Sequence, residues 1–236
     1  MNTEVLYMVM PAYNEEENIE ETARSWHEAL TGTGENSRLV IINDGSKDHT
    51  YDILCRLQKE LPQLVPLTKP NSGHGATLLY GYHYALDHGA DYIFQTDSDG
   101  QTRPEEFPAF WNRRHEKDVI IGYRNHREDG VSRVFVTKVL KFVLWMIFHL
   151  QITDANTPFR LMKRDMLQKY IQKVPQDFNL SNVMLTVLFV KNKVNMEFVP
   201  ITFRPRQGGI NSINFRKIVG IGRQAIRDFR TIRKTI

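Results

Sequence analysis

The chain has 236 residues, of which 41% are hydrophobic and 25% are charged, and its formal net charge is +4. This composition is typical of a globular protein, and the length suits one sizeable α/β domain. The apolar content excludes disorder as the main state. Cys55 is the only cysteine in the sequence, so a disulfide scaffold is excluded as well.

Short apolar runs alternate with amphipathic segments through the first hundred residues. The apolar runs predict buried strands at residues 5–10, 39–42, 64–67 and 92–96. Apolar residues at helical spacing predict helices at residues 15–30, 50–61 and 74–88. A strand–helix alternation of this kind predicts a mostly parallel sheet with flanking helices and right-handed crossovers.

The second half of the sequence is less regular. It predicts strands at residues 119–122 and 196–203, the latter at an edge of the sheet, and helices at residues 131–150, 165–172 and 182–191. Residues 215–236 predict a basic amphipathic helix. We therefore expect an α/β domain over residues 1–212, followed by an amphipathic basic helix over residues 213–236.

The N-terminal residues lack the basic segment that begins a secretory signal. The longest strongly apolar stretch covers residues 142–153, whereas a bilayer span needs about 20 apolar residues. We therefore expect a cytoplasmic protein that has no transmembrane helix.

Acidic residues follow the fourth predicted strand, at the edge where ligands bind in parallel sheets. Asp97 and Asp99 are separated by one residue, and a tight turn there lets both carboxylates reach one cation. Carboxylate oxygens are hard ligands that suit Mg²⁺ or Mn²⁺. Gln101 follows at a spacing where its amide faces the same site. The alternative is an ordinary solvated turn, but the position after the fourth strand favours the metal site.

Polar residues at the ends of the first two strands indicate a nucleotide site. Asp44 can accept a hydrogen bond from a base or a ribose, and Glu15 is expected near the ribose. The alternative is a simple turn at residues 43–46, in which a serine caps the next helix. Gly73 lets the backbone pass close to the nucleotide, although residues 71–75 lack a complete phosphate-loop pattern. The floor under the base is expected to consist of Pro11, Ala12 and Tyr13.

Four motifs occur in the same order as in a known family. They are residues 11–15, 43–46, 71–75 and 97–101, and together they resemble the GT-A nucleotide-sugar domain of the inverting family-2 glycosyltransferases. Within that family, the sequence most resembles the dolichyl- and polyprenyl-phosphate sugar synthases. This narrower resemblance rests on residues 97–101, 122–124, 154, 157–160, 200–203 and 206–209. The whole resemblance covers residues 5 to about 215.

The resemblance implies a metal-dependent enzyme with a GT-A fold. It would move a hexose from a UDP- or GDP-linked sugar, with inversion, to a membrane polyprenyl phosphate such as undecaprenyl or dolichyl phosphate. Such a reaction belongs to the biosynthesis of cell-envelope glycans. Two alternatives remain: transfer of the sugar to a hydroxyl of a cell-surface glycan, and a catalytically silent module that binds a nucleotide sugar.

The resemblance also implies roles for particular residues. Mg²⁺ or Mn²⁺ is expected at Asp97, Asp99 and Gln101. Charge that builds up on the departing diphosphate is stabilised by a cation and by basic side chains, and the forked donors of arginine suit phosphate. The catalytic residues implied are Asp99, Arg124, Arg133 and Arg206. The nucleotide-sugar-binding residues implied are Pro11, Ala12, Tyr13, Glu15, Asp44, Gly73, Asp97, Ser98, Gln101 and Arg160.

The acceptor decides whether the enzyme needs a base. A hydroxyl acceptor requires a carboxylate that takes its proton, whereas a phosphate monoester is already ionised at neutral pH, because its second pKa is about 6. Residues 178–185 contain no acid, although relatives often carry one in this segment. This favours a phosphate acceptor, and Asp154 and Asp177 are the remaining candidates for a base.

A polyprenyl phosphate resides in a membrane, so an enzyme without a span must reach the membrane surface. Residues 131–150 and 215–236 combine apolar faces with lysine and arginine, as do helices that lie in the headgroup layer of anionic membranes. The alternative for each is packing on the sheet or on a second subunit of a homo-oligomer. For residues 215–236 we expect a membrane or dimer contact rather than the core. The expected location is therefore peripheral, on the cytoplasmic face of the membrane, and no nucleic-acid partner is expected.

Overall fold

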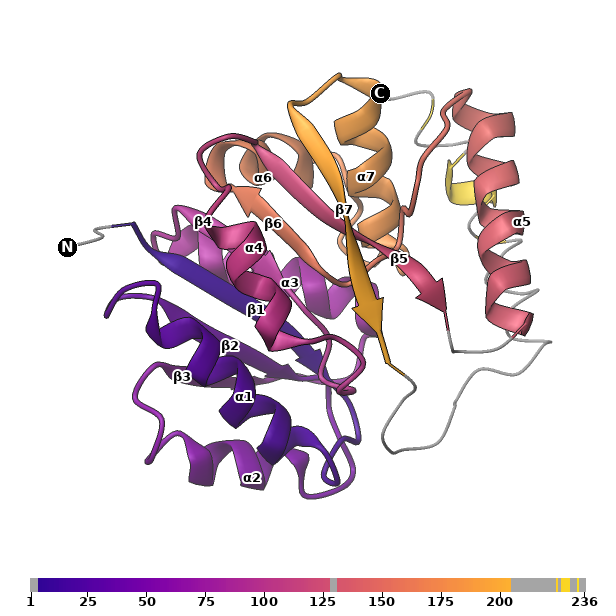
Figure 1. Cartoon of the computed structure of the whole chain (residues 1–236). Helices are drawn as coiled ribbons and strands as arrows, with labels where there is room; N and C mark the ends of the chain where they lie inside the picture. Colours follow the sequence, from indigo (N-terminus) through magenta and orange to yellow (C-terminus); the bar gives the residue numbers. More distant parts are fainter. Residues whose placement is uncertain (1–3, 128–130, 205–223, 225, 230–232, 234–236) are drawn as a thin grey trace.

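The computed structural model describes residues 4–127, 131–204, 224, 226–229 and 233. In this part of the chain, a seven-stranded sheet has the order β3-β2-β1-β4-β6-β5-β7 (Figure 1). The strands are β1 (Leu6–Ala12), β2 (Arg38–Asn43), β3 (Leu64–Thr68), β4 (Tyr92–Gln95), β5 (Val119–Arg127), β6 (Arg160–Lys163) and β7 (Met196–Phe203). The helices are α1 (Ile19–Thr31), α2 (Thr50–Leu57), α3 (His74–Asp87), η1 (Pro104–Glu106), α4 (Phe107–Trp111), α5 (Val131–Phe148), α6 (Arg164–Ile171) and α7 (Ser181–Lys191).

The pairing of the strands confirms a mostly parallel sheet. β1 pairs in parallel with β2 and with β4, β2 with β3, and β5 with β7. β6 runs antiparallel between β4 and β5. Because β1, β2 and β4 are parallel neighbours, their carboxyl ends meet at one edge of the sheet, and β7 lies at the outer edge as the sequence predicted.

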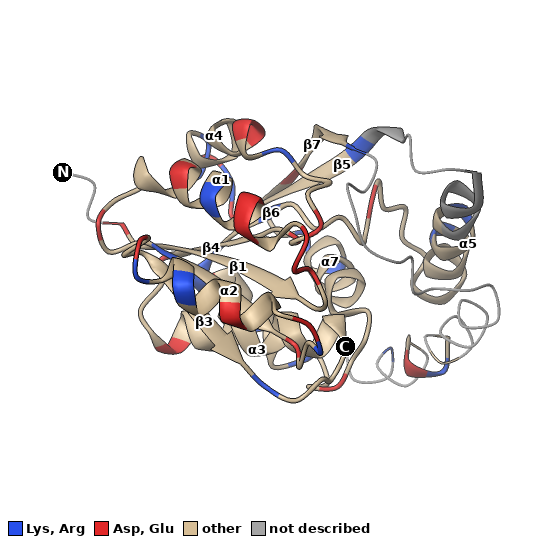
Figure 2. Ribbon diagram, turned by 90° about the horizontal axis from the view of Figure 1, so that it is seen from below, with Lys and Arg blue, Asp and Glu red and all other residues tan. Residues whose placement is uncertain are grey.

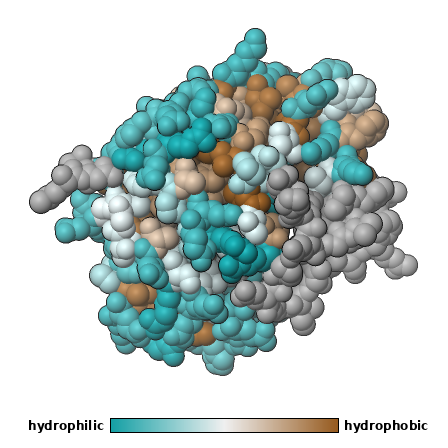
Figure 3. Space-filling view, viewed as in Figure 1, coloured by the Kyte–Doolittle hydropathy of each residue, from teal (hydrophilic) through white to brown (hydrophobic). Residues whose placement is uncertain are grey.

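Helices pack on both faces of the sheet, because successive strand residues point to opposite sides. On β1, Val9 belongs to a core cluster shared with α3, α5, α6 and α7. Its neighbour Met8 belongs to a second cluster shared with α1, α2 and α4. On the face shown in Figure 3, hydrophobic patches are small and interrupted by hydrophilic residues, since most large apolar side chains lie in these two clusters.

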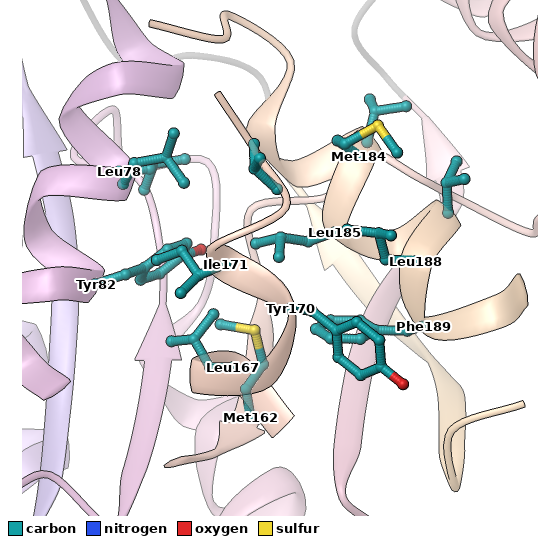
Figure 4. Packing of buried hydrophobic residues seen from close by; sticks show 14 of the residues in the cluster. Leu78, Tyr82, Met162, Leu167, Tyr170, Ile171, Met184, Leu185, Leu188 and Phe189 are labelled. Carbon is teal, nitrogen blue, oxygen red and sulfur yellow. The ribbon is translucent and has the colours of Figure 1, made fainter. Parts of the chain in front are cut away.

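Close packing of α3 on the sheet determines where this helix begins. Leu78 and Tyr82 on α3 face residues of α6 and α7 in the first core cluster (Figure 4). On the side of the sheet, a Cβ at Gly81 would lie 2.5 Å from Cγ1 of Val9 and 2.8 Å from Cδ1 of Ile42. The glycine therefore allows α3 to approach the sheet closely, and its first turn reaches the strand ends.

The structure adds three elements to those predicted from the sequence. They are β6, the short 3₁₀ helix η1 and the short helix α4. β6 is the strand that interrupts the parallel order, and it places Arg160 opposite Gln95 of β4. Its four residues have no alternating pattern of their own, so pairing with β4 and β5 defines it.

The C-terminal segment packs differently from the expectation. The predicted boundary between residues 212 and 213 lies outside the described residues, as does most of the predicted helix. Of this segment, residues 226–229 are helical, and Phe229 is fully buried. Its ring centroid lies 5.8 Å from those of Phe148 and Phe178. The preference for a membrane or dimer contact is therefore wrong at Phe229, which packs in the core next to α5.

Candidate functional site

A cleft of about 730 Å³ lies beyond the carboxyl ends of β1, β2 and β4. Its walls are the loops after these strands and the beginning of α3. In the view from below, acidic loop segments lie near the centre of the molecule (Figure 2). The structure brings together in this cleft the predicted site residues Pro11, Ala12, Tyr13, Glu15, Asp44, Gly73, Asp97, Ser98 and Asp99.

The loop after β1 forms one wall of the cleft. Ala12 ends the strand in the interior, and Tyr13 turns outward so that 42% of its surface is exposed. The backbone N–H of Asn14 donates to Oγ of Ser46 at 2.9 Å, and Oδ1 of Asn14 accepts from the N–H of Lys47 at 2.9 Å. These bonds tie the loop after β1 to the loop after β2, so this wall is formed without a ligand.

Asp44 anchors the loop that leads into α3. Its Oδ1 accepts from Nζ of Lys69 and from the N–H of Ser72, and its Oδ2 accepts from the N–H of Gly73. Burial raises the pKa of Asp44, but the hydrogen bonds from Lys69 and Ser72 lower it and leave the pKa below its ordinary value. Asp44 is thus held as a carboxylate at the cleft, although three protein donors already contact it.

The glycine-containing loop before α3 is shaped by contacts within the protein. Gly73 has φ +87, a left-handed conformation that favours glycine, and it lines the cleft. Gly75 leaves no room for a side chain, because the backbone of residues 178–179 lies directly against it. The segment that approaches Gly75 therefore belongs to the chain itself. The predicted passage of this loop close to a nucleotide stays a prediction.

Asp97 and Asp99 occupy the loop after β4 and both line the cleft. Oδ1 of Asp97 lies 3.1 Å from Nε2 of His74, and Oδ1 of Asp99 accepts from the N–H of Gln101 at 3.2 Å. Among the described residues, no group of three or more His, Cys, Asp or Glu side chains is placed to hold a metal ion. Two carboxylates fit a cation such as Mg²⁺ or Mn²⁺ that keeps further positions for phosphate and water oxygens.

The interpretation of the sequence assigned no role to His74. It is the first residue of α3, it lines the cleft, and its side chain is 51% exposed. Burial lowers the pKa of His74, but the carboxylates of Asp97, Asp99 and Asp44 raise it further, so that the pKa lies above its ordinary value. The neighbouring carboxylates therefore favour the protonated form of the imidazole.

Two predicted site residues lie away from the cleft. Gln101 is buried, and its Nε2 donates to the backbone oxygen of Arg204 at 2.8 Å. Arg160 is 0% exposed, and burial lowers its pKa. The Arg160 guanidinium donates to the backbone oxygens of Ala155, Thr157 and Asn182. The structure therefore corrects both assignments: Gln101 is not placed as a metal ligand, and Arg160 cannot contact a nucleotide in the cleft, because β6 directs it into the interior.

The predicted catalytic arginines and the two candidate bases, Asp154 and Asp177, have distinct environments. Arg124 forms an ion pair with Asp154, with Nε and Nη2 each 2.9 Å from a carboxylate oxygen. Asp154 is therefore not a free base, whereas Asp177 is exposed in the loop before α7. Arg133 belongs to α5, but its side chain lies outside the described part, and Arg206 lies outside it entirely. Their predicted roles stay predictions.

α5 has one face in the core and one face in solvent. Leu144 and Ile147 are buried, whereas Phe142 is 58% exposed and Trp145 is 51% exposed. An open groove of about 670 Å³ runs between this part of α5 and residues 150–153, with Lys141 among its lining residues. Across the described ranges, every helix is too short or too polar to cross a membrane.

Lys69 and His74 are two residues of the cleft region to which the sequence interpretation assigned no role. Lys69 directly follows β3, the strand beside β2, so its place at the same sheet edge was a usable signal. His74 follows Gly73 in a loop already assigned to the nucleotide. His74 and Asp97 are 23 positions apart in the sequence, and no local sequence pattern predicts a contact between them.

Comparison with known proteins supports the fold and the family. A relative, the undecaprenyl-phosphate 4-deoxy-4-formamido-L-arabinose transferase of Salmonella paratyphi B, is 22% identical over 217 residues, which are 91% of this chain and 64% of the relative. The chain thus spans less than two thirds of the relative's length.

Solved structures of glucosyl-3-phosphoglycerate synthase from Mycobacterium tuberculosis have the same fold. The complex with Mn²⁺, UDP and glucosyl-3-phosphoglycerate has a TM-score of 0.71 at 15% identity, covering 98% of this chain and 80% of that one. The complex with Mn²⁺, UDP and phosphoglyceric acid has a TM-score of 0.75 at 15% identity, covering 98% and 79%. The expected GT-A fold, a mostly parallel α/β sheet with flanking helices, is confirmed.

The family itself is shown by a direct match to its sequence model. The model described as glycosyl transferase family 2 matches residues 7–171, from β1 through α6. That range contains the cleft and the paired aspartates, and it is well over half of the chain. The chain therefore belongs to glycosyl transferase family 2.

Proposed function

We propose that this glycosyltransferase moves a hexose from a UDP- or GDP-linked sugar, with inversion, to a membrane polyprenyl phosphate. Two relatives support the two substrates. The Salmonella protein is named as an undecaprenyl-phosphate sugar transferase, and the mycobacterial structures contain UDP and Mn²⁺. The observation that carries the proposal is the pair Asp97 and Asp99 in a cleft that Asp44 also lines.

In this proposal, different residues of the cleft bind different parts of the nucleotide-sugar donor. Asp97 and Asp99 would hold Mg²⁺ or Mn²⁺, and such a cation would supply positive charge that stabilises the departing diphosphate. Asp44 and the loop after β1 hold the nucleoside, with the exposed ring of Tyr13 beside it. The ordered loops reduce the loss of conformational freedom on binding, since their hydrogen bonds already exist without a ligand.

The acceptor is proposed from the surroundings of the available acids. A phosphate oxygen of the acceptor forms a bond to the anomeric carbon while the bond from that carbon to the β-phosphate oxygen breaks. The nucleoside diphosphate leaves with the electron pair, and no proton has to be removed from an ionised phosphate. Asp154, which would be a candidate base for a hydroxyl acceptor, is instead paired with Arg124. Arg124, Arg133 and Arg206 are proposed to stabilise the phosphates.

Activity assays test the donor and the acceptor together. The full-length protein is incubated with Mn²⁺ and with UDP-glucose or GDP-mannose, in the presence of undecaprenyl phosphate or of a glycan acceptor. We expect transfer to the lipid phosphate only, and we expect Asp99→Ala to abolish it. The control is Asp52→Ala, which removes an aspartate that is 78% exposed on α2. Transfer to the glycan would favour the hydroxyl-acceptor alternative, and binding without any transfer would favour a silent module.

We further propose that α5 contacts an anionic membrane. Its exposed apolar residues Phe142 and Trp145 lie beside the exposed lysines Lys138 and Lys141, the combination by which surface helices bind anionic headgroups. Because the acceptor lies in the membrane, this face would bring the enzyme to its substrate. A dimer contact through the same face is the competing outcome.

Vesicle binding tests this surface. Phe142→Ser combined with Trp145→Ser should abolish co-sedimentation of the protein with vesicles that contain phosphatidylglycerol. Tyr80→Ser is the matched control, because Tyr80 is an exposed aromatic residue on α3. If the double variant still binds vesicles, or if it changes only the oligomeric state in solution, α5 is not the membrane contact.

A further inference from the structure

His74 is placed beside one of the two paired aspartates by the start of α3. Its Nε2 lies 3.1 Å from Oδ1 of Asp97, a hydrogen-bonding distance. Both side chains line the donor cleft, and the imidazole remains half exposed. The contact joins the loop after β4 to the start of α3, and both line the cleft.

The backbone around His74 allows little freedom of position. Asp44 accepts a hydrogen bond from the N–H of Gly73 at 3.0 Å, and Oγ1 of Thr77 donates to the carbonyl oxygen of Gly73 at 2.9 Å. The next residue, Gly75, lies against the backbone of residues 178–179. The imidazole therefore extends from a helix start that several contacts hold in place, and it can orient the Asp97 carboxylate.

Carboxylates that bind metal ions are usually oriented by hydrogen bonds from neighbouring groups. The bond from His74 to Oδ1 of Asp97 sets the plane of this carboxylate. We propose that His74 is a positioning residue that holds Asp97 in the orientation needed for the divalent cation. The inference rests on the proposed cation site at Asp97 and Asp99. His74 does not need to contact the cation, the sugar or the reacting atoms.

A hydrogen-bonding role predicts which substitutions are tolerated. His74→Ala removes the donor. His74→Gln keeps an amide N–H at a reach close to that of Nε2, so it should restore the contact with Asp97. The chain also contains a matched pair elsewhere: Nδ1 of His49 lies 3.2 Å from Oδ2 of Asp52, with both side chains largely exposed. His49→Ala therefore removes a comparable imidazole–carboxylate contact that the proposed cation site does not use.

The affinity of the full-length protein for Mn²⁺, measured by electron paramagnetic resonance in the presence of UDP, tests the inference. Loss of a group that orients a metal ligand typically weakens metal binding by about 10- to 100-fold, and we expect this for His74→Ala. His74→Gln should stay within a few-fold of the unchanged protein, and His49→Ala should equal it. UDP affinity without metal should be the same in all four proteins.

The outcomes separate this inference from the proposed function. Unchanged Mn²⁺ affinity in His74→Ala, or equal weakening in His74→Ala and His74→Gln, would overturn the positioning role. Asp99→Asn serves as the reference, because it removes a proposed ligand. If Asp99→Asn binds Mn²⁺ as well as the unchanged protein does, the cation site itself is wrong, and the role of His74 falls with it.

Discussion

The backbone carbonyl oxygen of Phe178 lies directly against Gly75 at the start of α3. A Cβ at position 75 would be 2.2 Å from this oxygen and 2.5 Å from the carbonyl oxygen of Asn179. The same loop reaches Gly73, where a Cβ would lie 3.1 Å from Oδ1 of Asn179. The segment before α7 therefore supports the loop that carries part of the donor cleft, although it lies about a hundred residues away in sequence.

Gly75→Ala tests this support. The added methyl group meets backbone atoms that cannot rotate away, so α3 or residues 178–179 must move. We expect a loss of about 1–3 kcal/mol in the free energy of unfolding. We also expect weaker UDP binding, because Gly73 lies in the displaced loop and donates a hydrogen bond to Asp44. Urea unfolding and UDP titration measure both. Gly32→Ala is the control, since nothing lies within 4 Å of its Cβ position. An unchanged Gly75→Ala variant would contradict this view of the loop.

The ion pair between Arg124 and Asp154 predicts a large effect on stability. Their side chains are 12% and 7% exposed, so removing one partner leaves a charge that is poorly hydrated. Asp154→Ala should lower the free energy of unfolding by about 3–5 kcal/mol in urea titrations. Asp177→Ala, at an exposed position, should change it by less than about 0.5 kcal/mol. A stable Asp154→Ala protein without transferase activity would instead identify Asp154 as the base.

The burial of Phe229 predicts that the C-terminal segment contributes to the stability of the core. Phe229→Ala removes a buried ring from between Phe148 and Phe178, and substitutions of this kind cost about 3–5 kcal/mol. Thermal and urea unfolding measure the loss. Phe142→Ala is the control, because Phe142 is largely exposed on α5. Equal stability of the two variants would show that Phe229 is not held in the core in solution.

The lowered pKa of Asp44 predicts that the stability of the protein depends on pH. Its folded pKa lies below the ordinary value of 3.8, so the folded protein binds fewer protons there than the unfolded chain. The stabilisation is fully present above 3.8 and is lost as the pH falls through the lower folded pKa. The difference in unfolding free energy between the unchanged protein and Asp44→Asn should therefore shrink in acid. A difference for Asp44→Asn that grows in acid would reverse the assignment.

The strand–helix alternation of the first half could be predicted because each element has a local hydrophobic pattern in the sequence. Each of β1 to β4 is a short apolar run, and each intervening helix has its own apolar stripe. Polar residues that follow such strands meet at one edge of a parallel sheet whatever the details of packing. Asp44, Asp97 and Asp99 were therefore placed in one site from the sequence alone.

β6 and Arg160 show where local patterns fail. The four residues of β6 become a strand because β4 and β5 offer backbone partners on both sides. Arg160 resembles a phosphate-binding arginine in sequence. The antiparallel pairing turns it into the interior, where the carbonyl oxygens of Thr157, in the loop before β6, and of Asn182, in the first turn of α7, accept its hydrogen bonds.

Four sequence motifs in the order of a known family indicated the GT-A architecture and the family. The sequence also placed the carboxylates of the cleft together, because the strand–helix alternation predicts a parallel sheet in which the loops after the strands share one edge. Only the tertiary structure decided that His74 contacts Asp97, that Arg124 neutralises Asp154 and that Phe229 lies in the core. These contacts join residues that are 23, 30 and 81 positions apart. Whether such side chains meet depends on how whole helices and strands pack, and on which buried charges form ion pairs. No short stretch of sequence encodes these long-range contacts.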